Sequence, residues 1–135
     1  MAHSRVSIWQ EVIVMIQKKD IENAPDDTVY IFGDNLDREG LGGQAAVARP
    51  FVEQGKAFGI PTKRHPGMDE GDFFSDRNDE ILFVKRAFAQ ILQMKQEGKK
   101  IIFFPSIGEG RAELPERSPM IHDLIKNFVE KHNEV

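Results

Sequence analysis

Apolar residues recur along the chain in short blocks separated by polar segments, and this pattern predicts alternating strands and helices. The clearest blocks are Thr28–Phe32 and Ile101–Phe104, which are almost uninterrupted by polar residues. Such runs are typical of strands that are buried on both faces of a sheet. The β-branched residues within Val6–Ile16 favour another strand, although Ser7 followed by Gln10 also fits a helix cap. We therefore expect the two clearest blocks to be buried strands of a sheet.

Helical spacing is clearest from Asn78 to Glu97, and Gly98 stands where a glycine commonly ends a helix. Ser118-Pro119 predicts the start of a second amphipathic helix, with serine as the cap and proline at the first position. A shorter helix is expected over Gln44–Arg49, ending at Pro50, and a weak strand over Phe58–Ile60. The apolar faces consist of Ile81, Val84, Phe88 and Ile91 in the first long helix, and of Ile121, Leu124, Ile125, Phe128 and Val129 in the second.

This order of elements predicts the α/β class, with a central mixed sheet, or an all-parallel one, and helices on both faces. The length of 135 residues fits one domain, so residues 1–135 are expected to form a single unit. Glycine-rich segments, Leu36–Gly43 and Ser106–Gly110, follow the two clearest strands. Because ligands bind outside the carboxyl ends of strands in such sheets, these segments are the candidate site.

Composition excludes several kinds of site. The 22 acidic and 18 basic residues give a net charge of −4, which disfavours a nucleic-acid partner bound by bulk positive charge. With no cysteine, the chain has no disulfide, thiolate metal site or cysteine nucleophile. The four histidines lack the spacing of metal ligands, so we expect no metal and no cofactor. The apolar runs are far shorter than the roughly 20 residues that span a bilayer, and no signal-peptide pattern is present. We therefore expect a cytoplasmic protein with no membrane partner; the pattern specifies no oligomeric state.

The two glycine-rich segments suit an anion. Backbone amides can surround a phosphate where no Cβ blocks the approach, and Gly40–Gly43 also precedes the predicted helix at 44–49, whose dipole would favour negative charge. Glycines in Ser106–Gly110 allow successive amides to turn inward as an anion nest. Each segment alone is also compatible with an ordinary tight turn. Together they predict a site for a diphosphate.

At these residues the chain resembles macrodomains. Phe104-Pro-Ser-Ile-Gly-Glu-Gly110, followed by Leu114-Pro115 and an amphipathic helix, is similar to their second ligand loop. Asn35, followed by Gly40-Leu-Gly-Gly-Gln-Ala45, is similar to their first. The resemblance covers most of the chain from Thr28 onward. It implies a three-layer α/β/α macro-like fold that binds ADP-ribose, a related NAD-derived nucleotide or an ADP-ribosylated macromolecule. It implies that Gly42, Gly43 and residues 106–110 hold the pyrophosphate and a ribose. With the polar residues beside the first loop, the candidate ligand-binding residues are Asp34, Asn35, Gly40, Gly42, Gly43, Gln44, Ser106, Ile107, Gly108, Glu109 and Gly110.

One macrodomain branch, the glycohydrolases that remove terminal ADP-ribose, carries a nucleophilic lysine in a segment similar to Thr62-Lys63-Arg64. Its acid corresponds to Ala112 here, with Glu113 one residue later. The resemblance therefore implies Lys63, Asn35 and Glu113 as candidate catalytic residues. Physically, a lysine beside an anion site either pairs with phosphate or, when burial lowers its pKa, attacks an anomeric carbon. A solvated surface lysine is the third interpretation.

Two other functions remain open at this point. The same loops suit a reader that binds the nucleotide without catalysis. The basic turn Lys63-Arg64-His65, with Arg38 near the first loop, suits a nucleic-acid or protein interaction module. Phe73-Phe74, in an acidic segment, either anchors that segment to the core or stacks on a ligand base.

Overall fold

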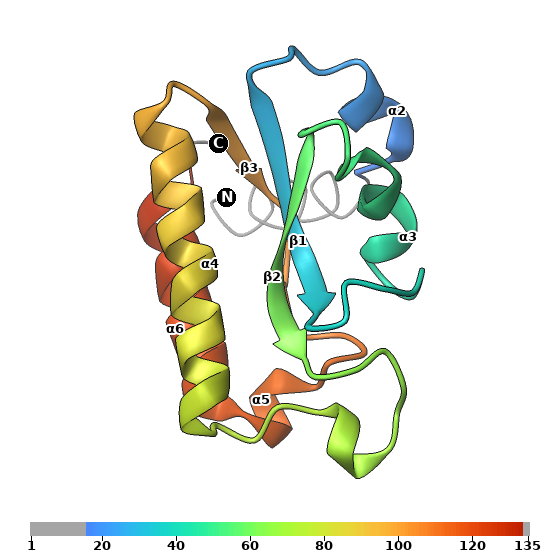
Figure 1. The fold of residues 1–135 in the computed structure, drawn as a ribbon, viewed down its shortest axis with the longest axis vertical. Coiled ribbons are helices and arrows are strands. Elements are labelled where there is room, and N and C mark those ends of the chain that lie inside the picture. The colour runs from blue at the N-terminus through green and yellow to red at the C-terminus, as the bar shows by residue number, and fades with distance from the viewer. Residues whose placement is uncertain (1–15, 134–135) are drawn as a thin grey trace, which may run out of the picture.

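Three parallel strands form the sheet of this computed structural model, which describes residues 16–133. The strand order is β2 (Ala57–Lys63), β1 (Thr28–Asn35), β3 (Lys100–Phe103), with β1 in the middle (Figure 1). The α/β class is confirmed. Both neighbours pair with β1 in parallel, so the described strands form the all-parallel alternative and not the mixed sheet. The strand predicted within Val6–Ile16 lies, except for Ile16, outside the described residues.

Strand β2 is longer than the predicted Phe58–Ile60. It continues through Pro61 and Thr62 to Lys63, which pairs with Asn35 at the end of β1 after a shift in register between Asp34 and Asn35. Proline cannot donate a hydrogen bond to a neighbouring strand, so the sequence from Pro61 onward resembled a loop. Pro61 is tolerated in β2 because β2 lies at the edge of the sheet. The extension has a functional consequence, because it brings Lys63 to the carboxyl end of β1.

The long helices form as predicted, as α4 (Asn78–Gln96) and α6 (Pro119–His132). In Figure 1 they lie to the left of the sheet, and α2 (Lys18–Glu22) and α3 (Ala45–Ala48) lie to its right. Helix α4 contacts β2 and β3, and α3 contacts β1. The remaining short elements are η1 (Arg49–Phe51), η2 (Glu70–Asp72) and α5 (Leu114–Arg117).

The core lies between the sheet and the apolar faces of these helices. Val84, Ala87 and Ile91 of α4 and Ile121 and Ile125 of α6 are buried. The two helices also meet through stacked rings of Phe88 and Phe128, whose centroids lie 4.0 Å apart. Residues one helical turn apart thus face the core, as the spacing predicted. A left-handed residue, Gly98 with φ +91°, follows α4.

Helix α6 begins at Pro119 after Ser118, as predicted, but the capping hydrogen bonds come from a different residue. The Ser118 hydroxyl does not cap the helix itself but donates to Asp76 Oδ1 at 2.6 Å. The Asp76 carboxylate in turn accepts from the backbone amides of Met120 and Ile121. Burial raises the pKa of Asp76, but these hydrogen bonds outweigh it and hold the pKa below its usual value. A carboxylate distant in sequence therefore caps α6.

Candidate functional site

The two glycine-rich loops face each other across one cavity. We call residues 36–44 the first loop, residues 104–113 the second loop, and the cavity of about 320 Å³ between them the loop cavity. The loop cavity lies at the carboxyl ends of β1 and β2. Its lining includes these predicted residues: Asp34, Asn35, Gly40, Gly42, Gly43, Gln44, Lys63, Ser106, Gly108 and Gly110. Residues from distant parts of the sequence therefore meet where the parallel sheet predicted a site.

The first loop presents a run of unused backbone donors. Within the described chain, no residue accepts a hydrogen bond from the amides of Gly40 to Gln44. Gly40 and Gly43 have φ of +89° and +59°, a region that glycine enters without the strain imposed by a Cβ. This backbone leaves amides available at the wall of the cavity, as an anion site requires.

The predicted helix dipole contributes less than expected. Helix α3 is only 4 residues long, and the chain then continues through Pro50 as η1 to Phe51 rather than stopping at the proline. Proline is tolerated there because it occupies a first-turn position, where its missing amide is not needed. Partial charge at a helix end requires several aligned peptides, so the loop amides themselves supply the positive wall.

The second loop supplies the facing donors. The amides of Gly110, Arg111 and Ala112 have no acceptor among residues 16–133, and all three residues line the loop cavity. The loop is folded by hydrogen bonds from Glu109 to Ser106 and from Leu114 to Gly108. At Gly108, with φ +84°, an added Cβ would clash with the Leu114 side chain, whose Cγ would lie 2.9 Å away. Position 108 therefore needs a glycine, because its φ is left-handed and the Leu114 side chain leaves no room for a Cβ.

Gln44 ties the two loops together. Its Oε1 accepts from the Gly33 amide at 2.9 Å, and its Nε2 donates to the Pro105 carbonyl at 2.6 Å. Both polar ends of the amide are therefore used on the protein's own backbone. The sequence predicted a ligand contact here, and the structure gives Gln44 a positioning role at the base of the cavity.

Asp34 and Asn35 shape the first loop. The buried Asp34 carboxylate pairs with Arg49 and with Arg38, at 2.5 and 3.3 Å. The Asn35 side chain donates to the Glu39 carbonyl and accepts from the Glu39 amide. Both residues line the loop cavity, but these contacts already occupy their polar groups. These contacts fix the course of the backbone from β1 to the amides of Gly40 to Gln44.

Lys63 is 6% exposed, so its interpretation as a solvated surface lysine is wrong. Its Nζ donates to the carbonyls of Pro66 and Gly67 and lies 4.8 Å from the centre of the Phe73 ring. Burial chiefly, and then the nearby charge of Arg111, lower the pKa of this amine. A lysine of this kind is closer to its neutral, nucleophilic form than a solvated one.

Three predicted residues lie outside the lining of the loop cavity. Ile107 is buried in the core, and the Glu109 carboxylate contacts His122 of α6 at 2.9 Å. Glu109 therefore does not place its charge among the loop amides. Glu113 Oε1 accepts from Arg117 at 2.8 Å, although its charge still acts to raise the pKa of Lys63. Successive residues of this tight loop point in different directions, which spacing alone did not reveal.

Arg111 is a cavity residue that the sequence reasoning missed. It reaches from the second loop to the first, so that a Cβ built on Gly42 would lie 2.8 Å from Arg111 Nε. It makes no ion pair with any other residue of the described chain. The available signal was its position directly after Gly-Glu-Gly110, a place where a side chain can reach a ligand held by the nest.

Phe73 and Phe74 are 5% and 1% exposed, which confirms that they anchor their segment to the core. The Arg117 guanidinium stacks on the Phe73 ring at 3.7 Å. No group of histidine, aspartate and glutamate side chains that could hold a metal ion is found in the described residues. None of the helices between residues 16 and 133 has the length and apolar character to cross a bilayer.

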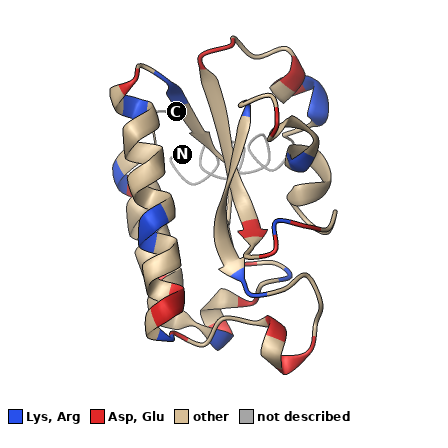
Figure 2. Ribbon diagram, in the orientation of Figure 1, with Lys and Arg blue, Asp and Glu red and all other residues tan. Residues whose placement is uncertain are grey.

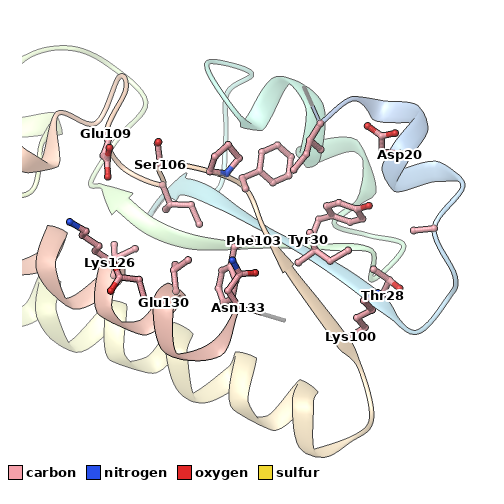
Figure 3. Close-up of a pocket in the computed structure, with 18 of the residues that line it drawn as sticks. Asp20, Thr28, Tyr30, Lys100, Phe103, Ser106, Glu109, Lys126, Glu130 and Asn133 are labelled. Atoms are coloured by element: carbon pink, nitrogen blue, oxygen red, sulfur yellow. The ribbon is translucent and has the colours of Figure 1, made fainter. Parts of the chain in front are cut away.

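A second cavity, of about 1110 Å³, lies between α2, the sheet and α6 (Figure 3). Its apolar surface includes Tyr30 and Phe103, and charged residues such as Lys100 and Glu130 also line it. Ile16, the first described residue, is part of the lining. The facing amide runs and Lys63 belong to the loop cavity, which is therefore the candidate site.

A sequence profile of a family of unknown function, DUF7831, matches residues 12–128. The matched range contains both loops, Lys63 and Arg111. No curated protein and no solved structure matches the chain.

Proposed function

The chain belongs to DUF7831, a family of unknown function, and we propose that it binds ADP-ribose or a related NAD-derived nucleotide in the loop cavity. The observation that carries the proposal is the pair of facing amide runs, from Gly40 to Gln44 and from Gly110 to Ala112, which have no acceptors among the described residues. Convergent amides bind phosphate oxygens without sequence-specific side chains. A diphosphate between the loops would satisfy both runs at once.

The size of the cavity supports a ligand held at its polar centre. A volume of about 320 Å³ is near the lower end of ligand pockets, which range from roughly 300 to 1,000 Å³. A pyrophosphate and an adjoining ribose suit this space, with the rest of the nucleotide extending beyond the loops. The order of the loops along the chain supports a macro-like, three-layer version of the α/β fold. A cytoplasmic location stays a prediction from the sequence.

Lys63 supports a hydrolase version of this proposal. In its neutral form, the amine would attack the anomeric carbon of the ribose and form a C–N bond as the bond to the attached group breaks. The leaving group takes a proton, and water then cleaves the C–N bond to regenerate the lysine. The lowered pKa of Lys63 favours this chemistry. ADP-ribosylated macromolecules would be the substrates.

Other contacts support a non-catalytic reader instead. The Lys63 amine is engaged by the carbonyls of Pro66 and Gly67, and the Glu113 carboxylate is paired with Arg117. Both candidate catalytic groups must leave these partners before they act. The reader and the hydrolase share the binding site and differ only in whether bound ADP-ribose is released from a conjugate.

The basic turn gives less support to a nucleic-acid module. Lys63 is buried, Arg64 is paired with Asp79 and Glu80, and His65 contacts Asp37. Figure 2 shows acidic and basic residues interspersed along the ribbon. Salt-dependent binding of nucleic acid depends on basic groups that are free to meet phosphates.

Titration calorimetry with ADP-ribose tests the binding proposal. We expect saturable binding by the native protein and its loss in Gly43→Glu, which places a carboxylate among the loop amides. Gly55→Glu is the matched control, because Gly55 also has positive φ, +75°, and an added Cβ there has no neighbour within 4 Å. Thermal unfolding checks that both variants fold. Absence of binding by the native protein at millimolar ADP-ribose would contradict the proposal.

An assay for release of ADP-ribose from ADP-ribosylated protein distinguishes the hydrolase from the reader. Release by the native protein that is lost in Lys63→Ala, with ADP-ribose binding retained, supports the hydrolase. Binding without any release supports the reader. Release at the native rate by both Lys63→Ala and Asn35→Ala would exclude the lysine mechanism.

A further inference from the structure

The cations of the loop cavity are not equivalent. Arg49 is committed to Asp34 and to the carbonyls of Glu39 and Gly40. Lys63 is committed to backbone carbonyls and to the Phe73 ring. Among the residues that line the cavity, Arg111 is the cation without an ion pair or hydrogen-bond partner in the described chain.

The acids of the cavity leave Arg111 available. The Asp34 carboxylate is 2% exposed and already lies between Arg49 and Arg38. Glu39 also lines the cavity, but its side chain makes no ion pair with a described residue, and its backbone is held by Asn35. The charge of Arg111 is felt inside the cavity, since it helps to lower the pKa of Lys63. Arg111 thus contributes a positive charge to the site that no ion pair with a described residue neutralises.

The position of Arg111 bridges the two amide runs. Its own amide belongs to the run of the second loop, while its side chain packs on the first loop at Gly42 and Gly43. A Cβ built on Gly42 would be 3.2 Å from Arg111 Cδ and 3.3 Å from its Cζ, so the side chain occupies the space that the glycine leaves open. An anion between the loops would therefore be within reach of both amide runs and of the guanidinium.

We propose that Arg111 closes the loop cavity over a pyrophosphate and selects diphosphate-containing nucleotides over monophosphates. A guanidinium offers a planar fork of donors, which spans the oxygens of two adjacent phosphates better than a single ammonium does. A monophosphate satisfies the amides but leaves part of that fork without an acceptor. This inference rests on the proposed function, because it assigns the ligand class of the same cavity.

The test compares ADP-ribose with AMP, which share the adenosine group, by calorimetry on four variants. Arg111→Gln should weaken ADP-ribose binding about tenfold or more, the scale of a lost charged hydrogen bond, and AMP binding by much less. Arg111→Lys keeps the charge without the fork of donors, so its affinity for ADP-ribose should lie between those of Arg111→Gln and the native protein. Gly42→Ala changes no charge but forces the Arg111 side chain off the first loop, and should also weaken ADP-ribose binding. Arg86→Gln, an exposed arginine of α4, is the control and should bind as the native protein does.

The outcomes separate the inference from the function on which it rests. If the native protein binds ADP-ribose and Arg111→Gln binds it equally well, the inference is overturned and the proposed function stands. An equal loss of ADP-ribose and AMP in Arg111→Gln also overturns it, because selection of a diphosphate would be absent. If the native protein binds neither nucleotide, the proposed function itself fails. Arg111 lies in an exposed loop position, so its substitution is compatible with folding, and a thermal melt verifies this.

Discussion

Asp34, Asn35 and Gln44 show how single polar residues work in this protein. Each lines the loop cavity, and each directs its side chain to a group of the same chain. Buried polar groups are costly unless they are paired, and these pairs hold an irregular loop in one conformation. The residues that sequence patterns single out as ligand contacts therefore act largely by placing backbone amides.

Asp76 is the residue whose ionisation most clearly supports the fold. Replacing it by Asn removes the charge, and asparagine readily adopts the left-handed φ of 58° found at this position. Because the Asp76 carboxylate accepts three hydrogen bonds at the start of α6, and an uncharged amide with one oxygen accepts them less well, we expect Asp76→Asn to lower the free energy of unfolding by about 0.5–1.5 kcal/mol at pH 7. Urea denaturation measures this loss, with Asp26→Asn, at an exposed position, as the control.

We also expect the difference in stability between the native protein and Asp76→Asn to depend on pH. The pKa of Asp76 is lowered in the folded state, so its contribution to stability is present above the unfolded pKa of about 3.9 and is lost as pH falls through the folded value. The stability gap between native protein and Asp76→Asn should therefore shrink below about pH 4. A gap that is constant from pH 7 to pH 2 would show that the carboxylate charge is not responsible.

Sequence reasoning succeeded and failed at residues of different kinds. It placed Gly42 and Gly110 at one site because glycine loops follow strands whose carboxyl ends meet, and the resemblance to macrodomains added Lys63, which lines the same cavity. It missed Arg111 and Asp76 because their roles depend on contacts with residues far along the chain. Long-range partners leave no periodic signal in a single sequence.

At the scale of elements, the predictions were best where periodicity was strong. Helices α4 and α6 have apolar residues at helical spacing, strand β1 has a continuous apolar run, and all three form as expected. Strand β2 was predicted too short because Pro61 and two polar residues interrupt its apolar pattern, although pairing with β1 carries the strand through them. The strength of a tertiary partner outweighed local preference there.

The second loop gives an element-scale prediction. Gly108→Ala would require a left-handed alanine and a clash with Leu114, so we expect a loss of unfolding free energy of about 1–3 kcal/mol and weaker ADP-ribose binding. Gly110→Ala is the matched control, because its φ is not left-handed and a Cβ there has no neighbour within 4 Å. Equal stability of the two variants in urea would refute the role assigned to the Gly108 conformation.

At the scale of the whole molecule, the parallel sheet explains why one cavity collects distant residues. Strands β1, β2 and β3 all run the same way, so the segments that follow them leave at one edge of the sheet. Gln44 then joins the first loop to the second across that edge. The site is thus a property of the topology, and its chemistry comes from the backbone of the two loops.

The central claim is that the facing loop amides bind a diphosphate nucleotide, and amide-resolved NMR during an ADP-ribose titration tests it most directly. We expect the largest, saturable shifts at the amides of Gly42, Gly43, Gly110 and Arg111, with Gly71 and Gly98, which lie outside the cavity, unchanged. Saturable shifts confined to residues around the α6 side of the sheet, or no shifts at millimolar ADP-ribose, would contradict the account.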